Sequence, residues 1–600
     1  MREADERPPR GRRRAIALVG LVAALAAVGC EGRRRAETGQ APQPRSGPAL
    51  VTIDLSGGVP EVPPSGMLGL SPKRQTFDEA LRVVEKARKD SAAKGILVRF
   101  GSATMGLARA EELSVALARA KADKPVFCHA EGFTNATYFA AARGCSKIYV
   151  APAGEVETIG LAAQIVYFRK LLVDELKLSV EILQVGKFKG AEEPLTRDGP
   201  SEEARASLEG VLSDLRETWL EGFRTGRPEA AKFVEEGPFG AAKAKERGLV
   251  DEVLYFDEAR DKGRAACQAV RDDVRFGAGV HKGDGDLADV LRVLSGDSAS
   301  APIALIRAAG SIRMSGEGGL FGDGSGISEK ELGKLLLRVE KDERIKALVL
   351  RIDSPGGSAL ASDLLWHQLM RIRDKKPVVV SVGEMAASGG YYLASTGSVI
   401  VADATSIVGS IGVVGGKVGV GDALERFGVH AETFPAKRGD QGAATRAAYL
   451  STFVRWDEPT RDRVRESMKG IYDLFLQRLA EGRRVPVEKI TPSAEGQIFS
   501  GREAKTRGLV DELGGLGTAL AKAKELAKLP EDAKLVILDS RPTLFELLGD
   551  DDEIEARARG VVAGLPVAVP EDVKVLLRAL APLAGTERTV LVPAFGFRIE

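Results

Sequence analysis

Residues 347–357 read ALVLRIDSPGG, a run of apolar residues that ends in a Pro-Gly-Gly turn. A short apolar run bounded by turn residues is typical of a buried strand. Ahead of it, Ser328 and Glu331 have the spacing of a helix capping box, and Leu332, Leu335 and Val339 follow at helical spacing. Amphipathic helices that alternate with apolar strands predict an α/β fold with largely parallel strand pairing.

The same pattern occurs 252 residues earlier in the chain. Residues 95–100 read GILVRF, so the strand arginines Arg99 and Arg351 differ by 351 − 99 = 252. Thr76 and Glu79 repeat the capping box. Farther on, the block RGLVDE at residues 247–252 returns unchanged at residues 507–512, at offset 507 − 247 = 260. We infer an internal duplication, with about eight residues inserted between these blocks in the second copy.

The duplication divides the chain of 600 residues into segments. We expect an N-terminal repeat over residues 49–275 and a C-terminal repeat over residues 301–540. Residues 276–300, rich in Gly, Asp and Ser, are expected to link them. Residues 31–48 form a predicted tether, and residues 541–600 have no counterpart in the first repeat.

The two repeats differ where chemistry would be found. At offset 252 the Pro-Gly-Gly turn of residues 355–357 is replaced in the first repeat by Ala-Thr-Met. Residues 384–391 read EMAASGGY, and the ungapped alignment sets Ser388 opposite Ala136, or opposite Asn135 after a slip of one residue. Neither counterpart is a nucleophile, so only the second repeat carries this serine.

The serine and glycine motifs of the second repeat are suited to acyl transfer. Gly-Gly after a strand leaves backbone N–H groups able to face an anion. Ser388 lies among small residues before an apolar helix, where the helix dipole and free N–H groups favour developing negative charge. A nucleophile beside two N–H donors is the arrangement that acyl transfer needs. The alternative is that Ala-Ser-Gly-Gly is only an N-capped turn.

Composition excludes several classes of protein. The formal net charge of +1 provides no general attraction for nucleic acid. The four cysteines lack the spacing of metal ligands, so we expect no metal site and no cofactor. They also suggest no disulfide framework, and Cys128 and Cys145, in apolar stretches, are expected to be buried core residues.

The N-terminus resembles an export signal. Six arginines within residues 2–14 precede Ala15–Val28, an apolar run of 14 residues, whereas a membrane-spanning helix needs about 20. The run ends LAAVGC at residues 25–30, which resembles a bacterial lipobox and would place a lipid on Cys30. An uncleaved short anchor is the alternative. Both interpretations place the rest of the chain outside the cytoplasm, at a membrane of the bacterial cell envelope.

With these motifs in hand, residues 48–540 resemble signal peptide peptidase A in its long, two-repeat bacterial form. The resemblance rests on DSPGG at 353–357, ASGGY at 387–391, GSIG at 409–412 and GKFKGAEEP at 186–194. It implies two tandem crotonase-like and Clp-protease-like ββα domains. It also implies assembly into a homo-oligomeric ring, a tetramer, and cleavage of remnant signal peptides at the membrane by a Ser/Lys dyad.

The resemblance assigns roles to individual residues. Ser388 matches the nucleophile and Lys189 the general base, with Ser410 orienting the lysine. Gly357 and Gly389 match the oxyanion donors, and Gly356 shapes the turn. The second repeat has FPAKRGDQG at residues 434–442 in place of the lysine motif, so one active site per chain is expected.

A lysine acts as a base only if its pKa falls to roughly 7–8, which burial achieves by disfavouring the charged form. We therefore expect Lys189 to be buried between the repeats, contacting Ser388 and Ser410 with no carboxylate close by. Lys187 is the rival base, and a histidine base is the rival chemistry. Two other functions remain open: an acyl-CoA enzyme of the same fold, and a catalytically silent scaffold at the membrane.

Overall fold

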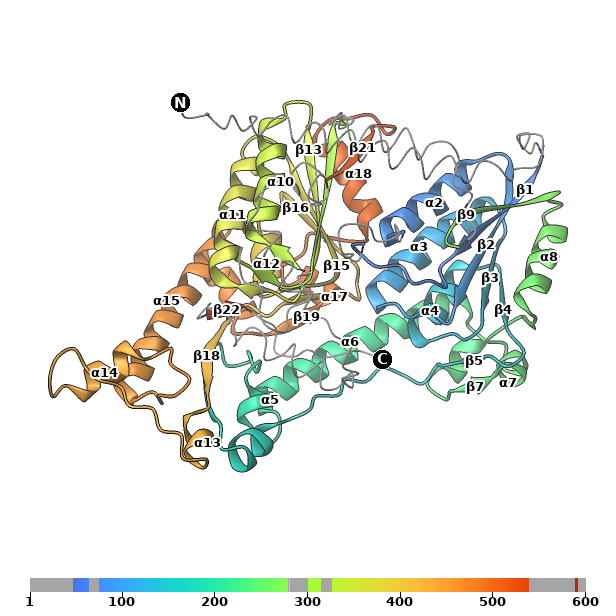
Figure 1. The fold of residues 1–600 in the computed structure, drawn as a ribbon. Helices are drawn as coiled ribbons and strands as arrows, with labels where there is room; N and C mark the ends of the chain where they lie inside the picture. The colour runs from blue at the N-terminus through green and yellow to red at the C-terminus, as the bar shows by residue number, and fades with distance from the viewer. Residues whose placement is uncertain are drawn as a thin grey trace, which may run out of the picture. The chain divides into compact units, whose positions relative to one another are not determined.

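The computed structural model describes residues 47–63, 75–278, 280, 301–314, 326–538 and 589–591 (Figure 1). The predicted signal segment with Cys30, nearly all of the tether, most of residues 276–300 and most of the C-terminal extension lie outside the described residues. Within the described residues no helix is both long enough and apolar enough to cross a membrane.

The first repeat is built on a six-stranded sheet of order β8-β4-β3-β2-β1-β9, in which every neighbouring pair is parallel. The strands are β1 (Ala49–Asp54), β2 (Ala93–Gly101), β3 (Val126–Ala130), β4 (Lys147–Val150), β8 (Glu252–Val253) and β9 (Arg271–Phe276). One face packs against α2 (Phe77–Lys89), α3 (Leu107–Asp123) and α4 (Asn135–Gly144), and the other against α8 (Phe256–Ala266).

The second repeat has the same parallel order, β20-β16-β15-β13-β10-β21, with β17 and β19 continuing from β15. Its strands are β10 (Ile303–Ala309), β13 (Ala347–Ser354), β15 (Val378–Ala387), β16 (Val399–Ala402), β17 (Ile407–Gly409), β19 (Ile498–Ser500), β20 (Glu512–Leu513) and β21 (Leu535–Leu538). Helices α10 (Glu329–Lys341), α11 (Ala359–Arg373) and α12 (Gly389–Ala394) cover one face, and α18 (Leu516–Leu526) the other.

The strand registers confirm the duplication. Ile96 pairs with Val126 in the first sheet, and Leu348 pairs with Val378 in the second, so both partners move by 252. Tyr149 pairs with Glu252, whereas Val401 pairs with Glu512, at offsets of 252 and 260. The inserted residues therefore lie between β16 and β20, and the predicted α/β class with parallel sheets is correct.

The helix starts agree only in part with the capping boxes expected from sequence. Thr76 and Glu79 form the box at the start of α2. At the start of α10, Ser328 makes no capping hydrogen bond, so the second capping box is wrong. Ser328 belongs instead to the short strand β12 (Ile327–Ser328), which pairs with β11 (Ile312–Arg313).

A strand and a helix join the two repeats. After α4 the first repeat extends through β6 (Ser179–Val185), which pairs antiparallel with β18 (Val413–Gly419) of the second repeat over seven residues. The long helix α6 (Glu202–Gly226) packs Trp219 and Phe223 on the first-repeat core. Its Asp214 accepts a hydrogen bond from the Ser500 hydroxyl of the second repeat at 2.6 Å.

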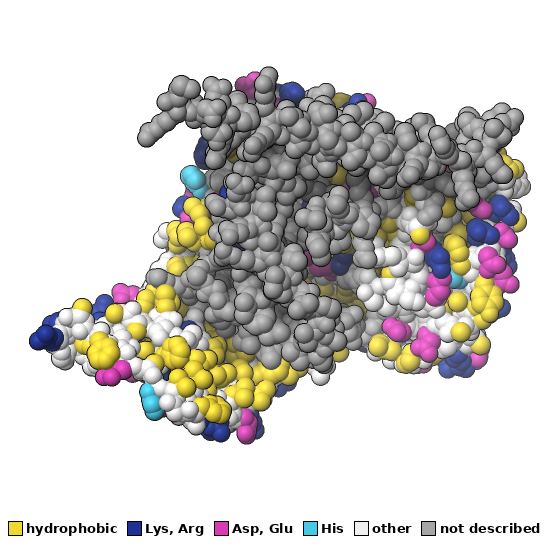
Figure 2. Space-filling model, in the orientation of Figure 1, with side chains coloured by type: hydrophobic (Ala, Val, Ile, Leu, Met, Phe, Trp, Pro, Cys, Tyr) yellow, Lys and Arg dark blue, Asp and Glu magenta, His cyan; other side chains and the backbone are white. Residues whose placement is uncertain are grey.

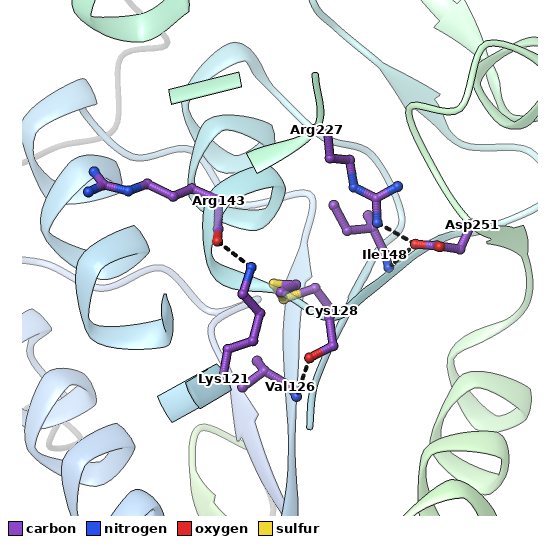
Figure 3. The surroundings of a disulfide bond; sticks show 9 residues. Lys121, Val126, Cys128, Arg143, Ile148, Arg227 and Asp251 are labelled. Carbon is purple, nitrogen blue, oxygen red and sulfur yellow. Dashed lines mark hydrogen bonds and ion pairs between the residues drawn. A yellow bond between two sulfur atoms is a disulfide. The ribbon is translucent and has the colours of Figure 1, made fainter. Parts of the chain in front are cut away.

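The cysteine interpretation needs correction. Cys128 on β3 and Cys145 at the end of α4 are buried, as expected, but a disulfide bond joins them (Figure 3). Near it, Lys121 donates a hydrogen bond to the Arg143 carbonyl at 2.8 Å. The sequence did not indicate this pairing, because the two cysteines are 17 residues apart. They come together only because α4 runs back alongside β3.

Candidate active site

Ser388 lies at the turn between strand and helix in the second repeat. β15 ends at Ala387 and α12 begins at Gly389, so Ser388 is the N-cap of the helix. Its backbone has φ +55° and ψ −115°, a conformation that non-glycine residues rarely adopt and that is found preferentially at functional sites. Its N–H donates to the Gly409 carbonyl at 2.8 Å, which ties the turn to β17.

Lys189 reaches the second repeat on the segment that follows β6. The Phe188 N–H donates to the Glu495 carbonyl at 2.8 Å, and the Ser410 N–H donates to the Gln497 carbonyl at 2.5 Å. The loop of residues 495–497 therefore contacts both the lysine segment and the Ser410 segment. Gly496 at its centre has φ +85°, and a Cβ there would lie 2.4 Å from the Lys189 Cα.

The lysine and the two serines meet in the interior. The Lys189 side-chain nitrogen Nζ lies 2.8 Å from the Ser388 hydroxyl, 2.7 Å from the Ser410 carbonyl oxygen and 3.1 Å from the Ser410 hydroxyl. All three side chains are fully buried. Burial lowers the pKa of Lys189 well below its ordinary value, because the charged form loses its hydration. Lys187, the rival base, is exposed.

One carboxyl group lies closer to the lysine than the sequence suggested. Burial lowers the pKa of Lys189, and Glu192, three residues after it, acts in the opposite direction through its negative charge. It forms no ion pair with Lys189 among the described contacts, and its Oε2 is buried without a hydrogen-bond partner there. Burial raises the pKa of Glu192 itself to about 7, so the expectation of no nearby carboxylate is wrong in this detail.

The glycine turn lies beside the serine. Gly356 and Gly357 have φ +107° and +150°, and a Cβ at Gly357 would lie 2.0 Å from the Ile312 carbonyl oxygen. A Cβ at Gly389 would lie 3.3 Å from both the Gly356 Cα and the Gly357 nitrogen. The turn and the first residue of α12 are thus in contact, as two converging oxyanion donors require.

The first repeat has a different residue at the serine position. The Tyr391 hydroxyl donates to the Leu509 carbonyl, and the Tyr138 hydroxyl donates to the Leu249 carbonyl, so the tyrosines correspond at offset 391 − 138 = 253. Ser388 therefore corresponds to Asn135, and the ungapped pairing with Ala136 is wrong. Asn135 hydrogen-bonds the backbone of Ile159 and Gly160, which leaves no nucleophile at this place.

The described histidines offer no alternative base. His129 is buried in the first repeat, where a ring nitrogen hydrogen-bonds the Leu254 carbonyl at 3.0 Å. His367 and His430 are exposed. Among the described residues no cluster of side chains has the composition of a metal site.

Known proteins match this chain in both of its repeats. The profile of Peptidase family S49 matches residues 118–269 and 371–530, together more than half of the chain. Protease 4 of Salmonella typhi is 31% identical over 483 residues, 78% of this chain and 72% of that protein. The chloroplastic serine protease SPPA of Arabidopsis thaliana is 31% identical over 408 residues, which cover 66% of this chain and 58% of that protein.

Among solved structures, a ClpP1 mutant from Listeria monocytogenes covers 36% of this chain with 14% identity and a TM-score of 0.22. That overlap is too partial for any detail of this chain to be inferred from it. The sequence relatives define the class: the chain is a serine protease. Because the family profile matches both repeats, the chain belongs to peptidase family S49.

Sequence reasoning missed the loop of residues 495–497. The sequence contained one signal for it, because the loop falls just ahead of the repeated RGLVDE block. At offset 260 the first repeat has Glu235, which also has a positive φ, as does Glu495. An alignment of the two repeats at offset 260 would therefore have indicated a shared turn at Glu235 and Glu495.

Proposed function

We propose that the chain is a membrane-tethered endopeptidase that acts through a Ser/Lys dyad and degrades hydrophobic peptides, including remnant signal peptides. Ser388 is the nucleophile, Lys189 the general base, and Ser410 orients the lysine. The backbone N–H groups of Gly357 and Gly389 stabilise the oxyanion. The observation that carries the proposal is the 2.8 Å contact between a fully buried lysine and a serine from the other repeat.

The proposed reaction proceeds through an acyl-enzyme. Neutral Lys189 accepts the Ser388 proton while Oγ attacks the peptide carbonyl, and the negative charge on the carbonyl oxygen is met by the two N–H groups. Lys189 then donates that proton to the departing amine. In the second half of the reaction Lys189 accepts a proton from the water that attacks the ester carbonyl, and it returns that proton to the departing Ser388 Oγ as the acid product is released.

The dyad is tested by three variants assayed against a hydrophobic peptide. Ser388→Ala and Lys189→Ala should each lower kcat by at least about 100-fold, the lower range for a lost general base. Lys187→Ala should match wild type, because that side chain is exposed. Full activity of Lys189→Ala would remove the dyad. A wild-type Ser388 that resists a fluorophosphonate would favour a silent scaffold, and turnover of an acyl-CoA without peptide cleavage would favour the acyl-CoA enzyme.

A strand of the chain itself supports an extended mode of peptide binding. β22 (Thr589–Leu591) pairs antiparallel with β14 (Gly357–Ser358), the strand that begins at the proposed oxyanion turn, and also with β18. Gly357 is the partner of Leu591. An extended substrate peptide would add to the same two edges, since strand addition satisfies its backbone hydrogen bonds.

Two truncations test this mode of binding. A chain that ends at residue 588 lacks β22, so its KM for peptide should fall relative to a chain that ends at residue 591. Equal KM values in the two truncated chains would contradict competition between β22 and substrate.

The proposed location is the bacterial envelope, with a lipid on Cys30. The buried Cys128–Cys145 disulfide supports an oxidising compartment, because such bonds persist outside the cytoplasm. Mass spectrometry of the mature N-terminus should find a diacylglycerol-modified Cys30. An intact Met1 in a membrane-bound protein would indicate an uncleaved anchor instead.

The duplication supports assembly into a homo-oligomeric ring. At offset 252, the pair of β6 and β18 corresponds to residues 431–437 and 161–167, whose apolar side chains Phe434 and Val166 are 79% and 53% exposed. Figure 2 shows hydrophobic side chains gathered over the region of α13 (Gly421–Glu425) and α14 (Gln441–Ala447), where Phe427 and Phe453 are also exposed. We propose that residues 431–437 of one copy pair with residues 161–167 of the next.

Sedimentation tests the ring and its size, for which the resemblance implies a tetramer. Phe434→Asp should dissociate the oligomer, whereas Val270→Asp, an exposed apolar position outside both segments, should leave it intact. A wild-type protein that sediments as a monomer would contradict the ring.

A further inference from the structure

The strand arginine of the repeat has different partners in the two copies. In the first repeat, the Arg99 guanidinium donates to the Glu131 carboxylate, with Nε 3.1 Å from Oε1. Arg351 is the second-repeat counterpart of Arg99 (351 − 99 = 252), and the acidic residue on its neighbouring strand β15 is Glu384, one residue beyond the position of Glu131 at that offset (131 + 252 = 383). No described contact joins Arg351 to Glu384. Each of them binds the first repeat instead.

Arg351 lies on β13, the strand that ends in the Pro-Gly-Gly turn. Its guanidinium is 1% exposed and contacts carboxylates from two places in the first repeat. Nε lies 2.8 Å from Glu61, and a terminal nitrogen lies 2.9 Å from Glu112 on α3. A third nitrogen donates to the Ser381 hydroxyl of β15 at 2.9 Å, so this one side chain joins β13, β15 and the first repeat.

Glu384 lies on β15, four residues before Ser388. Its carboxylate accepts hydrogen bonds from the Ala108 and Arg109 backbone N–H groups, at 3.1 and 3.0 Å, and from the Arg109 side chain at 3.0 Å. It thereby caps the N-terminus of α3, where the helix dipole favours a negative charge. The N-cap residue of α3 is Gly106, and a Cβ there would lie 2.1 Å from the Glu384 carboxyl carbon.

We infer that Arg351 and Glu384 are positioning residues, through which the first repeat holds the two strands that deliver the oxyanion turn and the nucleophile. The inference rests on the proposed Ser/Lys function. Because Lys189 and Ser388 come from different repeats, their contact depends on how the repeats are registered. A displacement of about 1 Å between reacting groups can cost on the order of 100-fold in rate. The first repeat therefore supplies both the base and the alignment of the nucleophile.

A matched pair of variants tests the inference. Glu384→Gln keeps an oxygen that can cap α3 but removes the charge that binds Arg109. Glu131→Gln makes the same change in the carboxylate that Arg99 binds within the first repeat. We expect Glu384→Gln to lower kcat by about 10- to 100-fold with KM within about twofold of wild type. Glu131→Gln should keep the wild-type kcat. The rate of Ser388 modification by a fluorophosphonate should follow kcat.

A second pair serves if Glu384→Gln fails to fold. Arg109→Gln leaves the helix cap in place and should lower kcat in the same way, whereas Arg109→Lys keeps the charge and should restore most of it. Equal kcat values in folded Glu384→Gln and Glu131→Gln, with only thermal stability changed, would overturn the inference. So would equal kcat values in Arg109→Gln and Arg109→Lys. A wild-type protein without Ser388 modification would instead count against the proposed function.

Discussion

The Lys189 Nζ lies 2.8 Å from the Ser388 Oγ, although 199 residues separate them in sequence and each belongs to a different repeat. Both side chains are fully buried. The pair therefore exists only when the two repeats are joined, and the pKa of the lysine depends on that joint burial.

The pH dependence of the proposed activity should respond to Glu192. Activity requires neutral Lys189 and so rises with pH through the pKa of this lysine. An ionised Glu192 favours the protonated lysine, so Glu192→Gln should lower the pKa of Lys189 further and move the acidic limb of kcat/KM to lower pH. Glu202→Gln is the control, because the Glu202 carboxylate is exposed at the start of α6. If the acidic limb of the kcat/KM profile lies at the same pH in Glu192→Gln and in wild type, the prediction is contradicted.

Gly496→Ala should displace the lysine. The new Cβ would lie 2.4 Å from the Lys189 Cα, in addition to the roughly 1–2 kcal/mol that a left-handed conformation costs a non-glycine residue. Gly508→Ala is the matched control, since Gly508 also has a positive φ but no atom within 4 Å of its Cβ position. Both variants should lose thermal stability, but only Gly496→Ala should lose peptidase activity. Equal activities would show that the loop does not position Lys189.

Removal of the disulfide should destabilise the first repeat without changing the chemistry. The bond closes a loop of 17 residues, for which chain entropy predicts a loss of about 3 kcal/mol in the free energy of unfolding. Denaturant unfolding of Cys128→Ala/Cys145→Ala should show this loss, with kcat unchanged in the folded protein. A reductant should destabilise wild type and leave the double variant unaffected; equal sensitivity of the two proteins would argue against the bond.

Asp353→Asn should flatten the dependence of stability on pH. Burial, Glu384 and Glu61 raise the pKa of Asp353 to about 7, so the folded state retains a proton that the unfolded state releases near pH 4. Stability is therefore lost as pH rises from about 4 to 7. Between pH 5 and pH 8 this carboxyl alone should cost wild type roughly 3 kcal/mol. Denaturant unfolding of both proteins at pH 5 and pH 8 measures this loss. Equal losses of unfolding free energy in wild type and Asp353→Asn would refute the prediction.

Much of the fold could be predicted from local pattern. The strand at residues 347–352 and its copy at 95–100 lie in parallel sheets with the expected offset of 252, because apolar runs and turn residues specify strands locally. The capping box at Ser328 failed, because strand pairing with Ile312 and Arg313 took over that segment. The Ala136 assignment failed because one residue is inserted before Tyr391, which the tyrosine hydrogen bonds and the strand pairing reveal.

The sequence by itself determined the duplication, the residue types at the candidate site and the loss of the serine from the first repeat. These properties depend on short motifs whose spacing is fixed along the chain. Only the tertiary structure decided the burial of Lys189, the Cys128–Cys145 bond and the contacts of Arg351 and Glu384 with the first repeat. Each of these depends on contacts between segments far apart in sequence, and a pKa or an ion pair follows from the surroundings that such contacts create.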